Sequence, residues 1–225
     1  MPAIPYPLIS AVSDRRRLAS TDEHACGRLI EWAAAVARAG VDVIHLRESG
    51  LTDSALAELA RRVVAATADT RAQVLINDRT DVALVTGCRG VHLPSAAPPA
   101  AVVRRVTPAG FVLGRSVHDH DDLAAVVAGC DYLTFGTVFA SASKPAAHRA
   151  AGLDALRRAC EQAAVPVQAI GGITLENAAM AAEAGAAGVA AIGLFTDGWS
   201  TSAGPERLTR VVDELRSVFT RTSRH

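Results

Sequence analysis

The sequence predicts a single (β/α)₈ barrel, and three features support this fold. Short apolar runs typical of strands alternate eight times with amphipathic helical segments over 225 residues, with short connections. The last two strands both end at glycines, the arrangement in which such barrels bind phosphate. Several predicted helices end in Ala-Gly or Thr-Gly, where glycine suits a left-handed helix end. These ends are Ala39-Gly40, Thr86-Gly87, Ala128-Gly129 and Ala184-Gly185.

A doubly wound sheet is the alternative fold for alternating strands and helices. That fold would require a glycine-rich turn after the first strand, where this chain reads Ser13-Asp14-Arg15. The near-equal spacing of the eight units favours the closed barrel.

The first half of the chain predicts four strand–helix units. Residues 6–12 are apolar and are predicted as the first strand. Residues 22–39 begin with acidic residues and are followed by Gly40, which predicts a long helix. Thr52 is a favourable N-cap for the next helix. The remaining elements are strands at 41–47, 72–76 and 90–93 and helices at 80–86 and 98–106.

The second half predicts four more strand–helix units, and the helix of the last unit closes the fold. A long loop of small and polar residues, 137–151, separates the sixth strand from the sixth helix. The strands are predicted at 111–116, 131–136, 166–170 and 188–192, and the helices at 119–128, 152–163, 174–184 and 205–219. With a frayed tail at 220–225, residues 1–225 form one domain without a linker.

Composition limits the class of protein. Lys+Arg and Asp+Glu balance at 23 each, so no basic surplus indicates nucleic acid. No long apolar run predicts a membrane span, and the proline-rich N-terminus does not resemble a signal peptide. The four cysteines are far apart and match no metal-site spacing. We expect a cytoplasmic protein without nucleic-acid or membrane partners, and the sequence leaves a homo-oligomer open.

The functional groups of such a barrel lie at the C-terminal ends of its strands. Arg47 can bind a carboxylate or phosphate through two hydrogen bonds. His45 lies on the same side of its strand, and we expect it at the barrel mouth with a pKa near neutral, where it can carry a proton. Lys144, the only lysine of the chain, is the second catalytic candidate beside His45, and it could close over an anion. Gly171, Gly172 and Gly193 are expected to bind phosphate through backbone N–H groups. Further substrate-binding candidates are Asn77, Asp78, Ser116, Thr137, Ser141 and Ser143.

Structural roles compete with these functional ones. Asp78 could cap the helix that follows it, Asn77 could hold a turn, and Ser116 could cap the fifth helix. His92 is expected to be a packed strand residue. His118 and His120 are expected to be solvated residues at a helix start.

Seven motifs lie along the strand ends of the predicted barrel. In chain order they are His45-Leu-Arg47-Glu, Ile-Asn77-Asp78-Arg, Gly90-Val-His-Leu, Gly114-Arg-Ser116-Val-His, Asp131-Tyr-Leu-Thr-Phe-Gly136-Thr-Val-Phe139, Ser141-Ala-Ser-Lys144 and Ala169-Ile-Gly-Gly-Ile173. In this order they resemble the thiamine-phosphate synthase/TenI family, from about residue 8 to residue 195. The resemblance implies a (β/α)₈ barrel of thiamine biosynthesis that binds a thiazole phosphate. Its synthases join hydroxymethylpyrimidine diphosphate to the thiazole phosphate with Mg²⁺, and its TenI branch tautomerises a thiazole carboxylate phosphate without metal.

The chain departs from the synthase pattern on the diphosphate side. The synthases carry Gln-x-Arg-x-Lys at the second strand, where this chain has His45, Arg47 and Ser49. Their Gly-Gln-x-Asp after the fourth strand supplies a Mg²⁺ ligand, but Ala97 stands at the position of that Asp. Their Thr-x-Thr-Lys becomes Ser141-Ala-Ser143-Lys144, which keeps the hydroxyls and the ammonium group.

These departures lead to three hypotheses. The first is a metal-independent TenI-like tautomerase, although the TenI histidine after the sixth strand is Thr137 here, so His45 would have to move the proton. The second is a working synthase, in which Asp78 would contribute to a Mg²⁺ site. The third is a non-catalytic thiazole-phosphate binder.

Overall fold

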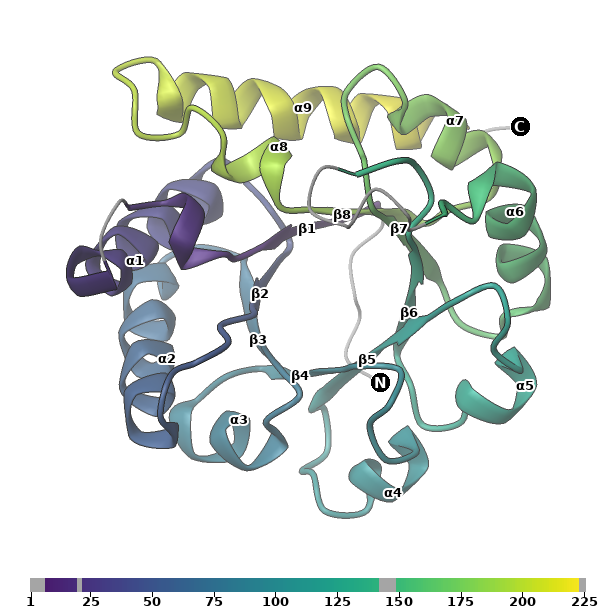
Figure 1. Ribbon diagram of the computed structural model, residues 1–225, viewed down its shortest axis with the longest axis horizontal. Helices are drawn as coiled ribbons and strands as arrows, with labels where there is room; N and C mark the ends of the chain where they lie inside the picture. Colours follow the sequence, from purple (N-terminus) through teal and green to yellow (C-terminus); the bar gives the residue numbers. More distant parts are fainter. Residues whose placement is uncertain (1–6, 20–21, 142–148, 223–225) are drawn as a thin grey trace.

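A computed structural model, which describes residues 7–19, 22–141 and 149–222, shows eight parallel strands closed into a barrel (Figure 1). Each strand pairs with its sequence neighbour, and β8 pairs with β1 to close the ring. Helices surround the ring of strands, as Figure 1 shows. The predicted (β/α)₈ barrel is therefore confirmed.

All eight predicted strands are present. Each observed strand is close to its predicted range, because the apolar runs extend only slightly beyond the paired residues. The strands are β1 Leu8–Val12, β2 Val43–Leu46, β3 Gln73–Asn77, β4 Gly90–Leu93, β5 Val112–Val117, β6 Tyr132–Gly136, β7 Val167–Ile170 and β8 Gly188–Ala191.

The helices agree with the prediction in position but differ in length. They are the 3₁₀ helix η1 Arg15–Arg17 and the α-helices α1 Asp22–Arg38, α2 Asp53–Thr67, α3 Thr80–Thr86, α4 Ala100–Arg104, α5 Leu123–Val126, α6 Gly152–Gln162, α7 Ala178–Glu183, α8 Gly193–Thr196 and α9 Gly204–Thr222. Thr52 caps α2 as expected, since its Oγ1 accepts a hydrogen bond from the Ala55 amide.

Local side-chain bonds explain two shortened helices. Asp122, rather than Ser116, caps α5, so the helix begins after the acidic segment predicted as its first turn. Thr174 and Asn177 bond each other's backbone amides at 3.3 and 2.9 Å, which delays the start of α7.

Other helices also differ from the prediction. The sequence predicts neither η1 nor α8, and α4 is four residues shorter than the predicted helix at 98–106. The closing helix α9 continues to Thr222, so the tail predicted as frayed is helical from residue 220 to 222, and 223–225 lie outside the described residues.

The interior of the barrel changes from apolar to polar along its axis. Leu8, Val43, Leu75, Val112 and Tyr132 form an apolar cluster separate from the core beneath the helices. Alternate residues of a strand face the same side, so the next inward positions follow two residues later. Those positions include the buried polar residues Ser10, His45, His92, Thr134 and Gln168.

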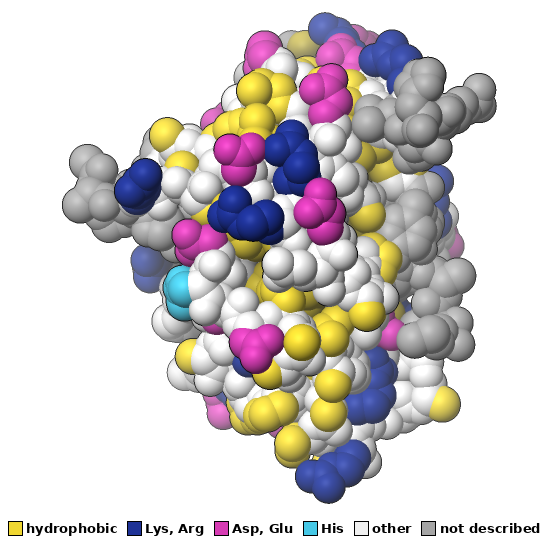
Figure 2. Space-filling model, turned by 90° about the vertical axis from the view of Figure 1, so that its right-hand side faces the viewer, with side chains coloured by type: hydrophobic (Ala, Val, Ile, Leu, Met, Phe, Trp, Pro, Cys, Tyr) yellow, Lys and Arg dark blue, Asp and Glu magenta, His cyan; other side chains and the backbone are white. Residues whose placement is uncertain are grey.

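The described surface carries charges of both signs. On the face over α5 to α7, acidic and basic side chains are interspersed (Figure 2). Within the described ranges, no helix has the length and apolar character needed to cross a bilayer.

Candidate functional site

A pocket of about 240 Å³ opens between the ends of β2 and β3. It is smaller than typical sites for whole drug-sized ligands, roughly 300–1,000 Å³, and suits one polar group of a larger substrate. Its lining includes Arg47, Ser49, Asn77 and Asp78, four residues for which the sequence suggested a role or a family correspondence. The structure therefore brings the ends of these two strands together around one cavity.

A hydrogen-bond network beside the pocket fixes the backbone of Arg47. The Arg47 amide donates to Ser13 Oγ at 2.9 Å, and Ser13 Oγ donates to Glu48 at 2.5 Å. Arg15 contacts Glu48 at 3.1 Å and the Ser49 carbonyl at 2.8 Å. Burial raises the pKa of Glu48, and the bonds from Ser13 and Arg15 oppose that shift. The Arg47 side chain itself is exposed, and its guanidinium makes no ion pair or hydrogen bond with the described residues.

The side chains of Asn77 and Asp78 do not have the structural roles that the sequence allowed, a turn for Asn77 and a helix cap for Asp78. The residue before α3 is Arg79, which makes no side-chain cap, so Asp78 does not cap that helix. Neither side chain forms a hydrogen bond among the described residues. Asp78 has φ 69°, a left-handed conformation that is uncommon outside glycine and clusters at functional sites.

The described part of the chain holds no group of three or more His, Cys, Asp or Glu side chains suited to a metal ion. Mg²⁺ typically uses one or two carboxylates together with substrate phosphates and water. Asp78 and Asn77 offer such a partial donor set, so they fit Mg²⁺ if a diphosphate supplies further oxygens.

The two glycines after β7 allow a close approach of the neighbouring loop. Gly171 and Gly172 have φ of 98° and 64°. A methyl group at Gly171 would lie 2.4 Å from Thr137 Cγ2, and one at Gly172 would lie 2.3 Å from the Ala140 carbonyl oxygen. The amides of Val138 and Phe139 donate to Ile170 and Gly171 at 2.9 and 3.0 Å. The glycines therefore have a packing role that the sequence analysis did not assign.

The turns after β7 and β8 both leave backbone N–H groups available. The amides of Gly172 and Ile173, after β7, and of Gly193 and Leu194, after β8, donate to no acceptor among the described residues. Strands β7 and β8 are paired neighbours, so these amides lie at adjacent strand ends. Free backbone N–H groups of this kind are suited to a phosphate.

An ion pair lies beside Gly193. A methyl group at this position would be 3.2 Å from Asp197 Oδ2 and 3.5 Å from Arg17 Nη2. Arg17 and Asp197 are 2.8 Å apart and both are partly exposed. Trp32 Nε1 donates to the Phe195 carbonyl at 2.9 Å and so fixes α8 against α1.

The expectation that His45 is a near-neutral proton carrier at the mouth is wrong in two respects. The side chain is 3 % exposed and lies inside the barrel, one inward position below Arg47. Burial lowers its pKa to about 4, so it is neutral at pH 7. The alternation of side chains along β2 correctly places His45 on the inner face of the barrel, but alternation does not give its depth along the barrel axis.

His45 belongs to a hydrogen-bonded chain that crosses the barrel. Its Nε2 is 2.8 Å from the Tyr132 hydroxyl, which is 3.0 Å from His92 Nδ1. His92 Nε2 is 2.9 Å from Ser116 Oγ, and Ser116 is half-buried at the end of β5. His92 is thus a packed strand residue, as expected. Tyr132 is absent from the predicted site residues. Its position two residues before Thr134, whose side chain faces the barrel interior, nevertheless indicated an inward side chain.

The remaining candidates surround β6. Thr137 is buried at the end of that strand and Ser141 is half-buried. Ser143 and Lys144 lie outside the described residues. His118, expected to be solvated, instead contacts the Gly136 carbonyl through Nδ1 at 2.5 Å.

Buried Arg115 organises the loop after β4, a role that the sequence did not reveal. Its guanidinium donates to the carbonyls of Ser95, Ala97 and Pro98 at 2.7 to 3.0 Å. This loop contains Ala97, the position at which the synthases place a metal-binding Asp.

Comparisons with known proteins identify the family of the chain. The profile of the thiamine monophosphate synthase family matches residues 18–195. A thiamine-phosphate synthase of Archaeoglobus fulgidus is 37 % identical over 86 % of this chain and 90 % of its own. One of Methanoregula boonei is 40 % identical over 68 % and 71 %. A thiamine phosphate pyrophosphorylase structure from Pyrococcus furiosus superposes with a TM-score of 0.76 at 27 % identity, covering 96 % of both chains. With the barrel, the strand-end motifs and these relatives in agreement, the chain belongs to the thiamine monophosphate synthase family.

Proposed function

We propose that the protein is a thiamine-phosphate synthase that joins hydroxymethylpyrimidine diphosphate to a thiazole phosphate. The observation that carries this proposal is the pocket lined by Arg47, Asn77 and Asp78, whose side chains have no hydrogen-bond partner within the described part of the chain. A cation beside a free carboxylate and amide suits a diphosphate that brings its own Mg²⁺. The relatives named as synthases favour this function over the tautomerase.

The two ends of the mouth would hold the two substrates. Arg47 would bind oxygens of the diphosphate, and Asn77 and Asp78 would hold Mg²⁺. A Mg²⁺ ion held by these two side chains would supply positive charge that neutralises the diphosphate leaving group. The amides of Gly172, Ile173, Gly193 and Leu194 would hold the thiazole phosphate. The thiazole nitrogen then bonds to the pyrimidine methylene carbon, and the carbon–oxygen bond breaks as diphosphate leaves with its electron pair.

The test is product formation from both substrates at millimolar Mg²⁺. We expect thiamine phosphate, and we expect more of it from the double variant Ser49→Lys, Ala97→Asp, which restores the cation and carboxylate of the synthases. Absence of product from the parent and from the double variant, with both folded, would contradict the proposal.

The tautomerase remains a second candidate because of His118. Its imidazole contacts the Gly136 carbonyl, next to Thr137, where the TenI branch has its histidine. If the protein tautomerises the thiazole carboxylate phosphate, His118 is better placed than buried His45 to move the proton. Ultraviolet absorbance would show isomerisation by the parent and its loss in His118→Gln. Calorimetric binding of thiazole phosphate with neither activity would instead identify a non-catalytic binder.

A further inference from the structure

The ion pair between Arg17 and Asp197 lies beside Gly193, at the proposed thiazole-phosphate site. It joins the 3₁₀ helix η1 to the end of α8, and Arg17 Nη2 is 2.8 Å from Asp197 Oδ1. The Arg17 side chain is 35 % exposed and that of Asp197 is 61 % exposed. Ion pairs as exposed as this one contribute little to stability. A ligand that offers the guanidinium a second anion can therefore replace part of this contact at low cost.

The backbone is fixed on both sides of the pair. In η1, the side chain of Arg15 is buried and bonds the Glu48 carboxylate. At the other side, the Asp197 amide donates to the Gly193 carbonyl at 2.9 Å. A change of partner by Arg17 thus needs a rotation of side chains and no movement of the loops.

The Arg17 guanidinium is close enough to Gly193 for one phosphate to contact both. A methyl group at Gly193 would lie 3.5 Å from Arg17 Nη2. Two covalent bonds of about 1.5 Å separate that methyl carbon from the Gly193 amide nitrogen, so Nη2 lies within about 6.5 Å of this nitrogen. Because each N–H···O bond spans about 2.9 Å, donors at this spacing can bond different oxygens of a single phosphate. A phosphate on the amides of Gly193 and Leu194 is therefore within reach of Arg17.

Arg17 also has donors available for this second contact. Its Nη2 donates to Asp197, whereas its Nε and Nη1 have no acceptor among the described residues. Guanidinium groups bind phosphate oxygens through pairs of charge-assisted hydrogen bonds. The other arginines of η1 are directed elsewhere: Arg15 donates to the Ser49 carbonyl, and Arg16 Nη2 would lie 3.7 Å from a methyl group at Gly50.

The carboxylate of Asp197 competes with such a phosphate. Its Oδ2 would lie 3.2 Å from a methyl group at Gly193, so its negative charge is as close to the phosphate site as the guanidinium of Arg17 is. Two anions at this distance repel each other unless a cation lies between them. Arg17 is the cation that contacts the carboxylate here.

We propose that Arg17 is a further phosphate-binding residue and that Asp197 competes with the phosphate for its guanidinium. The ligand is a phosphate group bound by the free amides after β7 and β8 together with Arg17. Its identity as the thiazole phosphate rests on the proposed function. Inorganic phosphate tests the role of Arg17 independently of that function.

Calorimetric titrations with thiazole phosphate and with inorganic phosphate test the role of Arg17. Arg17→Gln should bind both about tenfold more weakly, because it loses charge-assisted bonds to the phosphate. Arg16→Gln is the matched control, since it removes an exposed arginine from the same turn, and it should bind both within about twofold of the parent. Arg17→Gln that binds both ligands as tightly as Arg16→Gln does would overturn the proposal.

Asp197→Asn tests the competition. This change removes the negative charge and keeps the size of the side chain, so both ligands should bind about threefold more tightly or better. Binding no tighter than that of the parent would overturn the competing role of Asp197. Urea denaturation of the three variants shows whether each is folded.

The two ligands and the synthase assay separate the possible failures. If the protein makes no thiamine phosphate but Arg17→Gln weakens the binding of inorganic phosphate, the proposed function fails and the role of Arg17 stands. If the parent binds neither ligand, the role of Arg17 fails as well.

Discussion

Arg47 differs from Arg15 and Arg79 at the mouth in that its guanidinium has no partner among the described residues. Arg15 contacts Glu48, and Arg79 contacts Asp53 and Asp81, so both side chains have structural roles. The Arg47 guanidinium reaches the same pocket as Asn77 and Asp78, while its backbone is fixed by Ser13. A free cation on a fixed backbone is suited to an anion.

The first prediction concerns this cation. Arg47→Gln should bind inorganic diphosphate about tenfold more weakly, because charge-assisted bonds contribute about 1.5–3 kcal/mol. Arg61→Gln is the control, since Arg61 is exposed on α2 and lies 4.0 Å from Glu58. Calorimetry in the presence of Mg²⁺ measures both. The same affinity for diphosphate in both variants would show that Arg47 does not bind the diphosphate.

The second prediction concerns the depth of His45. Its folded pKa is lowered from 6.5 to about 4, so the unfolded state binds more protons between these values. The stabilisation from its neutral form is present above pH 6.5 and is lost as the pH falls toward 4. Urea denaturation at pH 7 and pH 4.5 should therefore show a larger loss of unfolding free energy in the parent than in His45→Gln, by about 2 kcal/mol. Parallel losses would mean that His45 is not buried in its neutral form.

At the scale of elements, arginines and glycines shape the loops that form the mouth. Arg115 donates to three carbonyls of the loop after β4, and the Gly171–Gly172 turn admits the loop after β6. The loop after β4 is thus positioned without the metal-binding Asp of the synthases. Its conformation depends on one buried guanidinium.

The third prediction tests that dependence. Arg115→Met keeps much of the side-chain volume but leaves the carbonyls of Ser95, Ala97 and Pro98 without their donor. Amide hydrogen exchange at Ser95, Ala96 and Ala97 should become faster, and the unfolding free energy should fall by about 1–3 kcal/mol. Arg105→Met, at an exposed position after α4, should change neither. Unchanged exchange in Arg115→Met would contradict the proposed role of this guanidinium.

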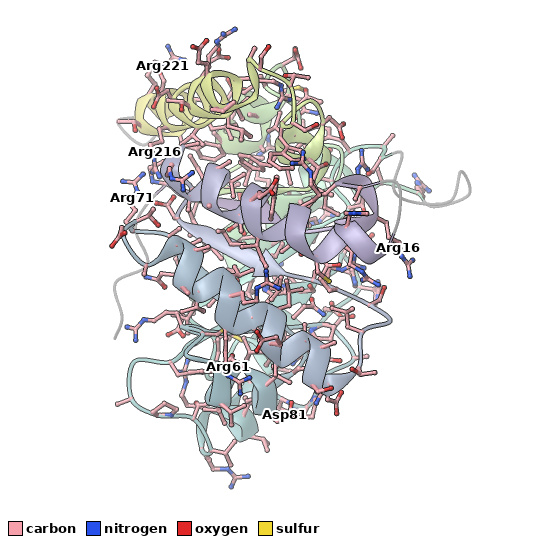
Figure 3. The ribbon with its side chains drawn as sticks, turned by 90° about the vertical axis from the view of Figure 1, so that its left-hand side faces the viewer. Arg16, Arg61, Arg71, Asp81, Arg216 and Arg221 are labelled. Atoms are coloured by element: carbon pink, nitrogen blue, oxygen red, sulfur yellow. The ribbon has the colours of Figure 1, made fainter. Side chains whose placement is uncertain are left out.

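At the scale of the whole molecule, a buried carboxylate joins the beginning and the end of the chain. Asp42 accepts from the Ile9 amide at 2.9 Å and from Arg216 of α9 at 2.7 Å. Arg216 also donates to the Gly40 carbonyl at 2.7 Å. Figure 3 shows Arg71 and Arg216 at the same end of the barrel, opposite Arg16. This cluster fastens α9 to β1 and β2 at the end of the barrel away from the mouth.

The fourth prediction compares the partners of this carboxylate. Asp42→Ala should lower the unfolding free energy by about 3–5 kcal/mol, because it leaves Arg216 and the Ile9 amide without their acceptor. Arg71 lies 3.7 Å from the same carboxylate but is 56 % exposed. Arg71→Ala should therefore cost no more than about 1 kcal/mol. Urea denaturation measures both, and similar losses would show that burial does not govern this cluster.

The fold could be predicted from the sequence because its signals are local. An apolar run predicts each strand, and the spacing of apolar residues predicts each helix. Gly40 marks the end of one helix and Thr52 marks the start of another, each to within a few residues. The short lengths of α5 and α7 escaped prediction because single side chains, Asp122 and the Thr174–Asn177 pair, determine where those helices begin.

The sequence by itself determined the barrel, the family and the strand ends that carry Arg47, Asn77, Asp78 and the glycines. Periodicity shows where each strand ends, and the motifs show which residues follow that end. Only the tertiary structure decided the environment of each group. His45 is neutral and bonded because ring closure brings it to Tyr132, 87 positions away in the sequence. Glu48, the carboxylate next to Arg47 in the sequence, is bonded by Ser13 and Arg15, and the Arg47 guanidinium has no partner among the described residues. Burial and partners depend on contacts across the barrel, and no local pattern in the chain encodes them.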